Sequence, residues 1–242
     1  INWLQHNLPT DLPVNEITEV NYYGAGCSTD DKRKQVADAM QVVFTTAQVN
    51  VGHDLLAAAR ALLGNKEGFA AILGTGTNTC LYNGREIIQH IDSGAYILGD
   101  EGSGCHIGKK LLTDYLRGYM PEPVRELFWE TYHLTPDDVN EQVYTKPLAN
   151  RFCAGFSKFV YDNTVNIAYS RNLVRTAFED FFRNLVTHYP NYQQYTFNCI
   201  GSVGYNFRNI LEELVIENGM VLGSIIRSPI DNLVKYHLEA KA

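Results

Sequence analysis

The sequence predicts an α/β protein with two lobes and a ligand cleft between them. Strand, loop and helix patterns occur at both ends of the chain, a three-strand meander follows the first of them, and a helical stretch precedes the second. The two α/β stretches also match at an offset of 177 residues, which pairs Gly24 with Gly201 and Asp54 with Asp231. Residue identity between them is negligible, so either chance or a true repeat explains the match. A repeat would give two related lobes that face each other across a cleft.

The first α/β stretch is predicted from alternation and helical spacing. Residues 17–23 alternate as a strand does and end at the small-residue loop Gly24–Gly26. Apolar residues then recur at helical spacing up to Phe44. A short strand at 48–51 and an Ala-rich helix at 55–63 complete the stretch.

A change of pattern near residue 66 predicts a second lobe. Residues 69–73 form an apolar strand, and Gly74–Gly76 a tight turn before a second strand at 78–82. The pair Asn83-Gly84 is a strong hairpin signal, and residues 85–90 are therefore predicted to form a third strand. This segment is therefore predicted to be an antiparallel meander.

Helices dominate the next hundred residues. The glycine-rich loop Gly99–Gly104 precedes a helix, and three or four more helices follow up to about Tyr189, with start signals at Pro121 and Thr135. The chain then returns to an α/β pattern. Its elements are a strand at 195–200, the loop Gly201–Gly204, a helix through Leu214, a strand at 220–227 and a helix at 228–242.

Composition excludes several classes of function. Of 242 residues, 45% are hydrophobic and 19% charged, and the net charge of −7 comes without the basic stripe that a nucleic-acid partner would require. No apolar run approaches the roughly 20 residues of a membrane span, and no signal peptide is expected. The five cysteines are odd in number and widely spaced, and the histidines lack ligand spacing, which disfavours a disulfide framework or a zinc site. We expect reduced thiols in a cytoplasmic protein.

Two loops of the second lobe carry polar residues among glycines. In Gly74–Asn78 (GTGTN), backbone N–H groups and the side chains of Thr75, Thr77 and Asn78 can cradle phosphate oxygens, although a plain hairpin turn also explains G-x-G. In Gly99–Gly104, Asp100 and its neighbour can accept hydrogen bonds from ligand hydroxyls, or simply cap the next helix.

Two further positions have both a functional and a structural interpretation. Asp54, at the end of a strand, can act as the general base for a sugar hydroxyl, or as the N-cap of the helix that follows. The small residues of Gly201–Gly204 let adenine approach the backbone, or serve packing.

The combined motifs resemble a known family. GTGTN at 74–78, AYILGDEGSG at 95–104 and GSV at 201–203 are similar to the N-acetylglucosamine kinases, which belong with the BadF-type ATPases in the actin-like ATPase, sugar kinase superfamily. Phe152–Phe156 also looks like a helix of that family. The resemblance extends from about Ile17 to His237.

The resemblance implies a role for each matching residue. Asp54 would activate the sugar 6-hydroxyl, and ATP with Mg²⁺ would supply the phosphoryl group. The residues implied for the nucleotide are Thr75, Gly76, Ala154, Gly201 and Ser202. Those implied for the sugar are Gly24, Gly26, Thr77, Asn78 and Asp100. No residue is assigned as a metal ligand, and a homodimer is expected.

The resemblance also implies three segments. Residues 1–65 would be a partial N-terminal lobe on the sugar side, and residues 66–228 a lobe with a helical insertion on the ATP side. Residues 229–242 would form a helix that packs back on the N-terminal lobe. The family's first phosphate-binding hairpin, whose Asp helps to place Mg²⁺, has no counterpart before Ile17. His53 is another departure, and it would tune Asp54, contact a substrate carboxylate or be a neutral turn residue.

Three functions remain open from the sequence. The first is an ATP-dependent kinase for an amino sugar, with N-acetylglucosamine as the leading substrate. The second is a BadF-type regulatory ATPase, which needs cysteines placed to hold a metal cluster between subunits. The third is a non-catalytic protein that binds a sugar or a nucleotide.

Overall fold

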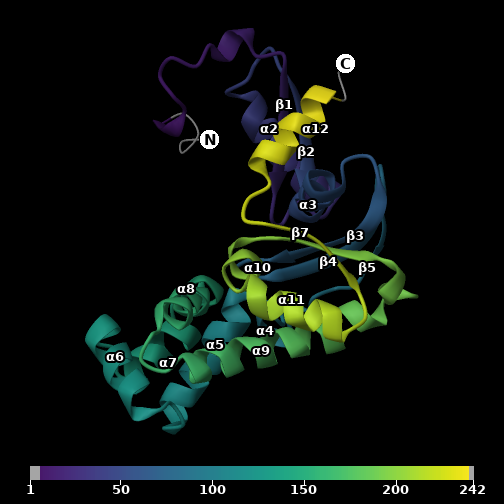
Figure 1. Cartoon of the computed structure of the whole chain (residues 1–242). Helices are drawn as coiled ribbons and strands as arrows, with labels where there is room; N and C mark the ends of the chain where they lie inside the picture. Colours follow the sequence, from purple (N-terminus) through teal and green to yellow (C-terminus); the bar gives the residue numbers. More distant parts are fainter. Residues whose placement is uncertain (1–5, 240–242) are drawn as a thin grey trace. The chain divides into compact units, whose positions relative to one another are not determined.

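The computed structural model describes residues 6–239 and divides the chain into two compact units, Ile1–Ala57 and Ala58–Ala242 (Figure 1). Helix α3 (Asp54–Leu63) runs across this division. The predicted α/β class is confirmed, because strands and helices alternate in both units. Each unit is described by itself below.

The first unit is built on two parallel strands joined by a helix. Strand β1 (Glu19–Gly24) pairs with β2 (Gln48–His53) along their whole lengths, and α2 (Asp30–Gln41) connects them. A 3-10 turn, η1 (Val14–Glu16), precedes β1. Both predicted strands are confirmed, with β2 two residues longer than expected. Met40 and Phe44 are buried in the small core under this pair.

Helix α2 ends earlier than its apolar spacing predicts. The spacing continues to Phe44, but the helix stops at Gln41. The side-chain amide of Gln41 donates to the carbonyls of Phe44 (2.8 Å) and Ala47 (3.0 Å), which stabilises a turn in place of another helical turn. Phe44 therefore reaches the core from the turn.

A five-stranded sheet forms the centre of the second unit, in the order β5-β4-β3-β6-β7. The first three strands make the predicted antiparallel meander, and β6 and β7 continue the sheet parallel to β3. The strands are β3 (Glu67–Leu73), β4 (Thr77–Asn83), β5 (Ile87–His90), β6 (Thr196–Ile200) and β7 (Val221–Ile226). The Asn83 side chain accepts from the N–H groups of Arg85 and Glu86, which confirms the predicted hairpin turn.

Most helices of this unit pack on one face of the sheet or extend beyond it, and α12 lies apart from them (Figure 1). Four helices lie between α5 and Tyr189, which agrees with the larger of the two predicted numbers. Two of them begin at the predicted start signals Pro121 and Thr135. The short helix α4 was not predicted. The helices are α4 (Ala95–Leu98), α5 (Gly104–Arg117), α6 (Glu122–Tyr132), α7 (Pro136–Tyr144), α8 (Ala149–Asp162), α9 (Ile167–Asn184), α10 (Ser202–Asn206), α11 (Arg208–Glu217) and α12 (Ile230–Glu239), with 3-10 turns η2 (Val186–His188) and η3 (Tyr192–Gln194).

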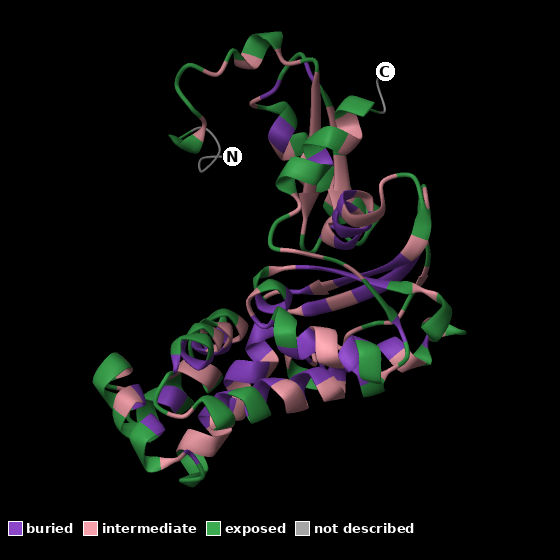
Figure 2. Ribbon diagram, in the orientation of Figure 1, coloured by how far each residue is buried: buried purple, intermediate pink, exposed green. Residues whose placement is uncertain are grey.

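Aromatic side chains fill the space between the sheet and α9. Phe182 stacks on Phe197 of β6 with ring centroids 5.6 Å apart, and Tyr189 meets the ring of Phe69 of β3 edge-on at 5.4 Å. The Tyr189 hydroxyl is paired with Thr79 Oγ1 at 2.9 Å, so its burial leaves no unsatisfied oxygen. Figure 2 shows the buried residues concentrated on the sheet and on the helix faces turned toward it.

The same order of elements occurs twice in the chain. β1-α2-β2-α3 and β6-α10-α11-β7-α12 are both a parallel strand pair with a helical connection and a final helix. Gly24 and Gly201 stand at the ends of the first strands, and Asp54 and Asp231 lie in the first turns of the last helices. The correspondence predicted at an offset of 177 residues is therefore present in the order of elements.

The C-terminal helix contacts the second half of α3. Asn232 donates to the carbonyl of Ala61 at 2.9 Å, and the guanidinium of Arg60 lies 5.3 Å from the ring centroid of Tyr236. Ala61 belongs to the 1–65 segment of the sequence-based division and to the second compact unit of the structure. The predicted lobe boundaries stay a prediction.

Two glycines offer a matched test of helix packing. A Cβ on Gly108 of α5 would lie 1.8 Å from the carbonyl oxygen of Cys153 on α8, whereas a Cβ on Gly155 of α8 would meet nothing within 4 Å. We expect Gly108→Ala to lower the free energy of unfolding by about 3 kcal/mol, because the two helices must separate. Gly155→Ala should raise it by up to about 1 kcal/mol, because alanine favours the helix. Urea unfolding measures both, and equal stability of the two variants would contradict the described packing.

Candidate functional site

Three glycine-containing loops meet where β3 and β6 end. These strands are parallel neighbours, so the turn Gly74–Gly76 after β3 and the loop Gly201–Gly204 after β6 lie at the same edge of the sheet. The loop Gly99–Gly104 joins them through α5. In open α/β sheets this edge is where ligands bind. The sequence predicted the three loops as candidates, and the structure brings them together.

The turn after β3 serves as the platform on which α5 begins. The N–H of Gly104 donates to the Gly74 carbonyl (2.8 Å), and the N–H of Cys105 donates to the Thr75 carbonyl (3.1 Å). Ser103 caps the helix by accepting from the N–H of His106 at 3.0 Å. The side chain of Thr75 stays exposed at the tip of the turn. Its hydroxyl is thus available to a ligand beside the positive end of a 14-residue helix.

Gly201 has a sufficient packing reason to be glycine. Its φ of 127° lies in the region that favours glycine, and a Cβ there would be 2.3 Å from the Leu73 carbonyl oxygen and 3.1 Å from the Gly74 nitrogen. The backbones of the two loops therefore touch. The next residue, Ser202, opens α10 and is exposed.

Asp100 ties the second loop to the first. It is 8% exposed and has a left-handed φ of 56°. Its Oδ1 accepts from the N–H of Thr77 (3.0 Å) and from the hydroxyl of Ser93 (3.1 Å). Its Oδ2 lies beside Gly76, where a Cβ would be only 2.9 Å away. One buried carboxylate thus holds three segments of backbone together.

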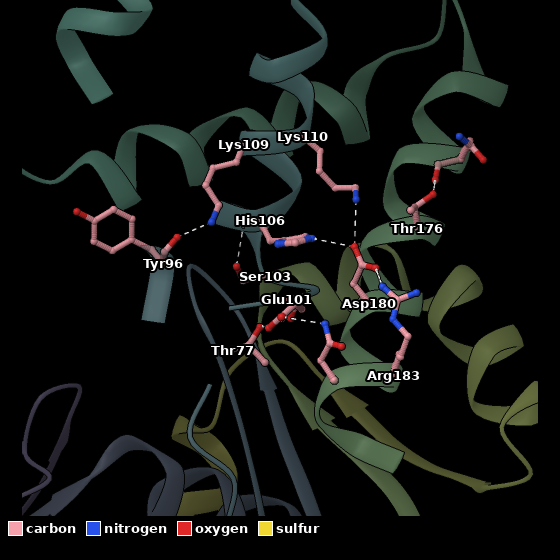
Figure 3. A network of polar contacts seen from close by, with 12 residues as sticks. Thr77, Tyr96, Glu101, Ser103, His106, Lys109, Lys110, Thr176, Asp180 and Arg183 are labelled. Carbon is pink, nitrogen blue, oxygen red and sulfur yellow. Dashed lines mark hydrogen bonds and ion pairs between the residues drawn. The ribbon is translucent and has the colours of Figure 1, made fainter. Parts of the chain in front are cut away.

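The other predicted sugar residues of this unit also have partners within the chain. Thr77 Oγ1 donates to the Glu101 carbonyl at 2.6 Å, and Asn78 Oδ1 is 3.0 Å from His90 Nε2. Figure 3 shows Glu101 next to Thr77, where its carboxylate accepts from Asn184 of α9 (2.9 Å). The sequence indicated Glu101 only as the acidic neighbour of Asp100 in its loop. Ser93, His90 and Asn184 were missed, since nothing local in the sequence links them to the glycine loops.

Helix α8 reaches the same loops from the other side of α5. A Cβ on Gly104 would lie 3.2 Å from Ser157 Oγ and 3.3 Å from a methyl of Val203, so residues of α8 and α10 approach the start of α5 closely. Ala154 lies one turn before Ser157, and its carbonyl accepts a hydrogen bond from the Ser157 hydroxyl at 2.8 Å. The predicted adenosine residues Ala154 and Ser202 thus come from elements that meet around Gly104.

The predicted residues of the first unit also share one sheet edge. Gly24, at the end of β1, pairs with His53 at the end of β2, and Asp54 follows directly. Gly26 has a φ of 80°, and a Cβ added there would meet nothing within 4 Å. Asp54 Oδ1 accepts from the N–H of Leu55 at 2.9 Å.

His53 also caps the start of α3, a role that the sequence gave as one of two interpretations of Asp54. Its Nδ1 accepts from the N–H of Leu56 at 3.4 Å, the bond that an N-cap side chain makes three residues into a helix. Accepting through Nδ1 requires a neutral ring protonated on Nε2. The helix therefore begins at Asp54, and His53 is the residue before it.

An ion cluster fixes α9 against α5 close to these loops (Figure 3). Asp180 accepts from Lys110 (3.1 Å) and lies 3.3 Å from His106 Nε2, and Arg183 also pairs with it. Burial lowers the pKa of His106. Burial also acts to raise the pKa of Asp180, but its hydrogen bonds from Lys110 and His106 outweigh this and leave that pKa lowered. The cluster therefore holds an ionised Asp180 beside a neutral His106.

The comparison with solved structures identifies the family. A candidate N-acetylglucosamine kinase from Porphyromonas gingivalis matches 95% of this chain and 80% of its own length, with 40% identity and a TM-score of 0.90. The chain belongs to the N-acetylglucosamine kinase-like family. The membership of the N-acetylglucosamine kinase-like family inferred from the GTGTN and GDEGSG motifs is thereby confirmed.

A more distant structure shares the fold. The candidate N-acetylglucosamine kinase from Chromobacterium violaceum matches 89% of this chain and 75% of its own, with 16% identity and a TM-score of 0.62. No protein-family model and no curated protein sequence gave a match. Within residues 6–239 no helix is long and apolar enough to cross a bilayer, and no group of three or more metal-ligating side chains is present.

The lowered pKa of His106 predicts a loss of stability in acid. Because the pKa of His106 in the folded protein lies below the usual 6.5, the unfolded chain takes up the proton first as the pH falls. The contribution of the neutral His106 to the free energy of unfolding is therefore present above pH 6.5 and is lost as the pH falls further. We expect His106→Gln, which keeps a donor for Asp180, to flatten the decline in free energy of unfolding between pH 7 and 5. The exposed His188 is the control, and its replacement by Gln should leave the profile unchanged. Identical profiles for wild type and His106→Gln would refute this role.

Proposed function

We propose that this protein transfers the γ-phosphoryl group of ATP to the 6-hydroxyl of an amino sugar, with N-acetylglucosamine as the substrate. The meeting of the Gly74–Gly76, Gly99–Gly104 and Gly201–Gly204 loops at one sheet edge, in a chain 40% identical to a candidate N-acetylglucosamine kinase, is the main support. Phosphoryl transfer depends mainly on positioning and charge stabilisation, and such loops can provide both.

In this proposal the nucleotide lies along the exposed side of the joined loops. The hydroxyl of Thr75 and the backbone at Gly76 bind the phosphates near the start of α5. Gly201, Ser202 and Ala154 line the adenosine. The residues fit such a ligand, because Thr75 and Ser202 are exposed and Gly155, next to Ala154, leaves open space above α8.

The sugar is assigned to Asp100, Thr77 and Asn78, together with Gly24 and Gly26. Asp100 Oδ1 already accepts two hydrogen bonds, so we assign its Oδ2 to a sugar hydroxyl. Thr77 donates its hydroxyl proton to Glu101, which leaves its oxygen free to act only as an acceptor. Asn78 keeps its amide donors when its oxygen pairs with His90.

Asp54 is assigned as the general base. The sugar O6 attacks the γ-phosphorus, its proton passes to the Asp54 carboxylate, and the bond to the β–γ bridging oxygen breaks to release ADP. Mg²⁺ would arrive on the phosphates of ATP and neutralise their charge, as is usual for this ion.

We also propose a cytoplasmic homodimer. The five free cysteines are all buried, which suits a reducing compartment. Burial also disfavours the regulatory ATPase alternative, because a cluster between subunits requires thiolates at the surface. Large apolar side chains such as Tyr119 (70% exposed) and Tyr144 (82% exposed) offer a surface for self-association.

An ADP-release assay across amino sugars tests the activity directly. We expect release that depends on N-acetylglucosamine and is slower with glucosamine or N-acetylmuramic acid. ATP hydrolysis that is independent of any sugar would support the regulatory ATPase instead. Sugar binding without turnover would support the non-catalytic alternative.

Replacement of Asp54 tests the proposed base. Asp54→Asn should lower turnover by about 100-fold or more, because the sugar hydroxyl loses its proton acceptor, while sugar binding and the circular dichroism spectrum stay close to those of the wild type. The matched control is Asp231→Asn, since Asp231 lies in the first turn of the corresponding helix α12. Full activity of the Asp54→Asn variant would contradict the proposed base and would mean that Asp54 serves only at the start of α3.

A further inference from the structure

Asp100, the residue assigned to a sugar hydroxyl, directly follows the single-turn helix α4 and Gly99. Three of the four residues of α4 are exposed, among them Ile97 and Leu98, and Tyr96 is the one that packs against the core. The residue that opens α4, Ala95, has a left-handed φ of 52°, and Asp100 has one of 56°. Non-glycine residues persist in this region only where surrounding contacts hold them. Side-chain packing contributes little here, so the segment depends on its hydrogen bonds.

The backbone at Asp100 does not continue the helix. In a continued α-helix the N–H of Asp100 would donate to the carbonyl of Tyr96, four residues earlier. It donates instead to the Ser93 carbonyl at 2.8 Å, and Asp100 Oδ1 accepts from the hydroxyl of the same serine at 3.1 Å. In this conformation the carboxylate lies beside Gly76 and also accepts from the N–H of Thr77. The Tyr96 carbonyl is left for another donor.

Lys109 of α5 supplies that donor. Its ammonium donates to the Tyr96 carbonyl, a charge-assisted hydrogen bond of the kind that lysines make to the last carbonyls of helices. In the part of the chain that the structure describes, Lys109 forms no ion pair, whereas the adjacent Lys110 pairs with Asp180 at 3.1 Å. Figure 3 shows the two ammonium groups on opposite sides of His106, one toward Tyr96 and one toward Asp180. The charge of Lys109 is thus directed to the backbone of α4.

Lys109 lies on a helix that is itself fixed at the candidate site. Helix α5 is 14 residues long, packs against α8 and begins on the carbonyls of Gly74 and Thr75. A group that fixes a binding residue is most precise when it lies on a rigid element. The contact with Tyr96 therefore ties the segment before Asp100 to the same helix that rests on the Thr75 turn.

We propose that Lys109 is a positioning residue for the sugar, because its bond to the Tyr96 carbonyl holds the segment from which Asp100 presents its carboxylate to a sugar hydroxyl. The assignment of Asp100 to the sugar rests on the proposed function, whereas the anchoring of the segment by Lys109 does not. Without the ammonium, the Tyr96 carbonyl loses its donor and the left-handed conformation of Asp100 loses a constraint. Lys109 thus acts on the sugar only through Asp100.

Hydrogen exchange without sugar or ATP tests the anchoring. In Lys109→Met, amide exchange within residues 93–100 should be at least about tenfold faster than in the wild type, because the N–H groups of Gly99 and Asp100 are protected by bonds inside that segment. Lys110→Met is the matched control, since it removes the same charge one position later on α5 and leaves the bond to α4 intact. Equal exchange of the segment in the wild type and Lys109→Met would overturn the proposal. So would an equal acceleration in β3, which would mean a general loss of stability.

Steady-state kinetics test the consequence for Asp100. Lys109→Met should raise the KM for N-acetylglucosamine by about tenfold and change kcat and the KM for ATP by less than about threefold, because Asp100 binds the sugar alike before and during the reaction. Lys109→Arg should restore most of the affinity, since a guanidinium can donate to the same carbonyl. An unchanged KM for the sugar in Lys109→Met, with only less folded enzyme, would refute the positioning role.

Failure of the proposed function would look different. A wild type that binds no amino sugar, with faster exchange of residues 93–100 still found in Lys109→Met, would refute the proposed kinase and support the anchoring by Lys109. Sugar binding by the wild type with the same KM and the same exchange in Lys109→Met would support the kinase and refute the role of Lys109.

Discussion

The close approach of backbones at the end of β3 is the constraint on which the candidate site depends. The Leu73 carbonyl meets Gly201, and the carbonyls of Gly74 and Thr75 accept the first N–H groups of α5. Any side chain at 201 would force the two loops apart, because its Cβ would lie 2.3 Å from that oxygen. The position of α5 and the contact between the two loops therefore both depend on the backbone at the end of β3. The aromatic core between the sheet and α9 then holds the surrounding elements rigid.

Packing and ligand binding are therefore not alternatives at these glycines. The sequence left open whether Gly201 and Gly76 serve a ligand or the fold, and the structure shows a packing reason for both. The same close approach leaves Thr75 and Ser202 exposed on two adjacent loops. A surface made of bare backbone and hydroxyl groups is what a nucleotide requires. A glycine that lets two loops touch also lets a ligand approach both.

Local patterns predicted the elements, and non-local contacts explain what they missed. Alternation, helical spacing and the Asn83-Gly84 signal were sufficient for the strands and for most helices, because these depend on neighbours in sequence. The end of α2 depends on the Gln41 side chain, and the pairing of β3 with β6 joins residues more than a hundred positions apart. Asp100 was found through its loop, but its partner Ser93 and the anchor of Glu101 on Asn184 were not. A single sequence contains no signal for such pairs.

The duplicated order of elements allows Asp54 to be compared with Asp231, the aspartate at the corresponding position of the second copy. Asp54 and Asp231 stand at corresponding helix starts, but their connections to the preceding strands differ. β2 ends at His53 and α3 begins at Asp54, so the paired strand and the His53 cap fix the backbone on both sides of the carboxylate. β7 ends at Ile226, and three residues separate it from α12. A general base must be held within a fraction of an ångström, and groups on regular elements are held better than groups after a loop. The paired strand therefore leads directly into the residue that carries the Asp54 carboxylate, whereas a three-residue link precedes the helix of Asp231.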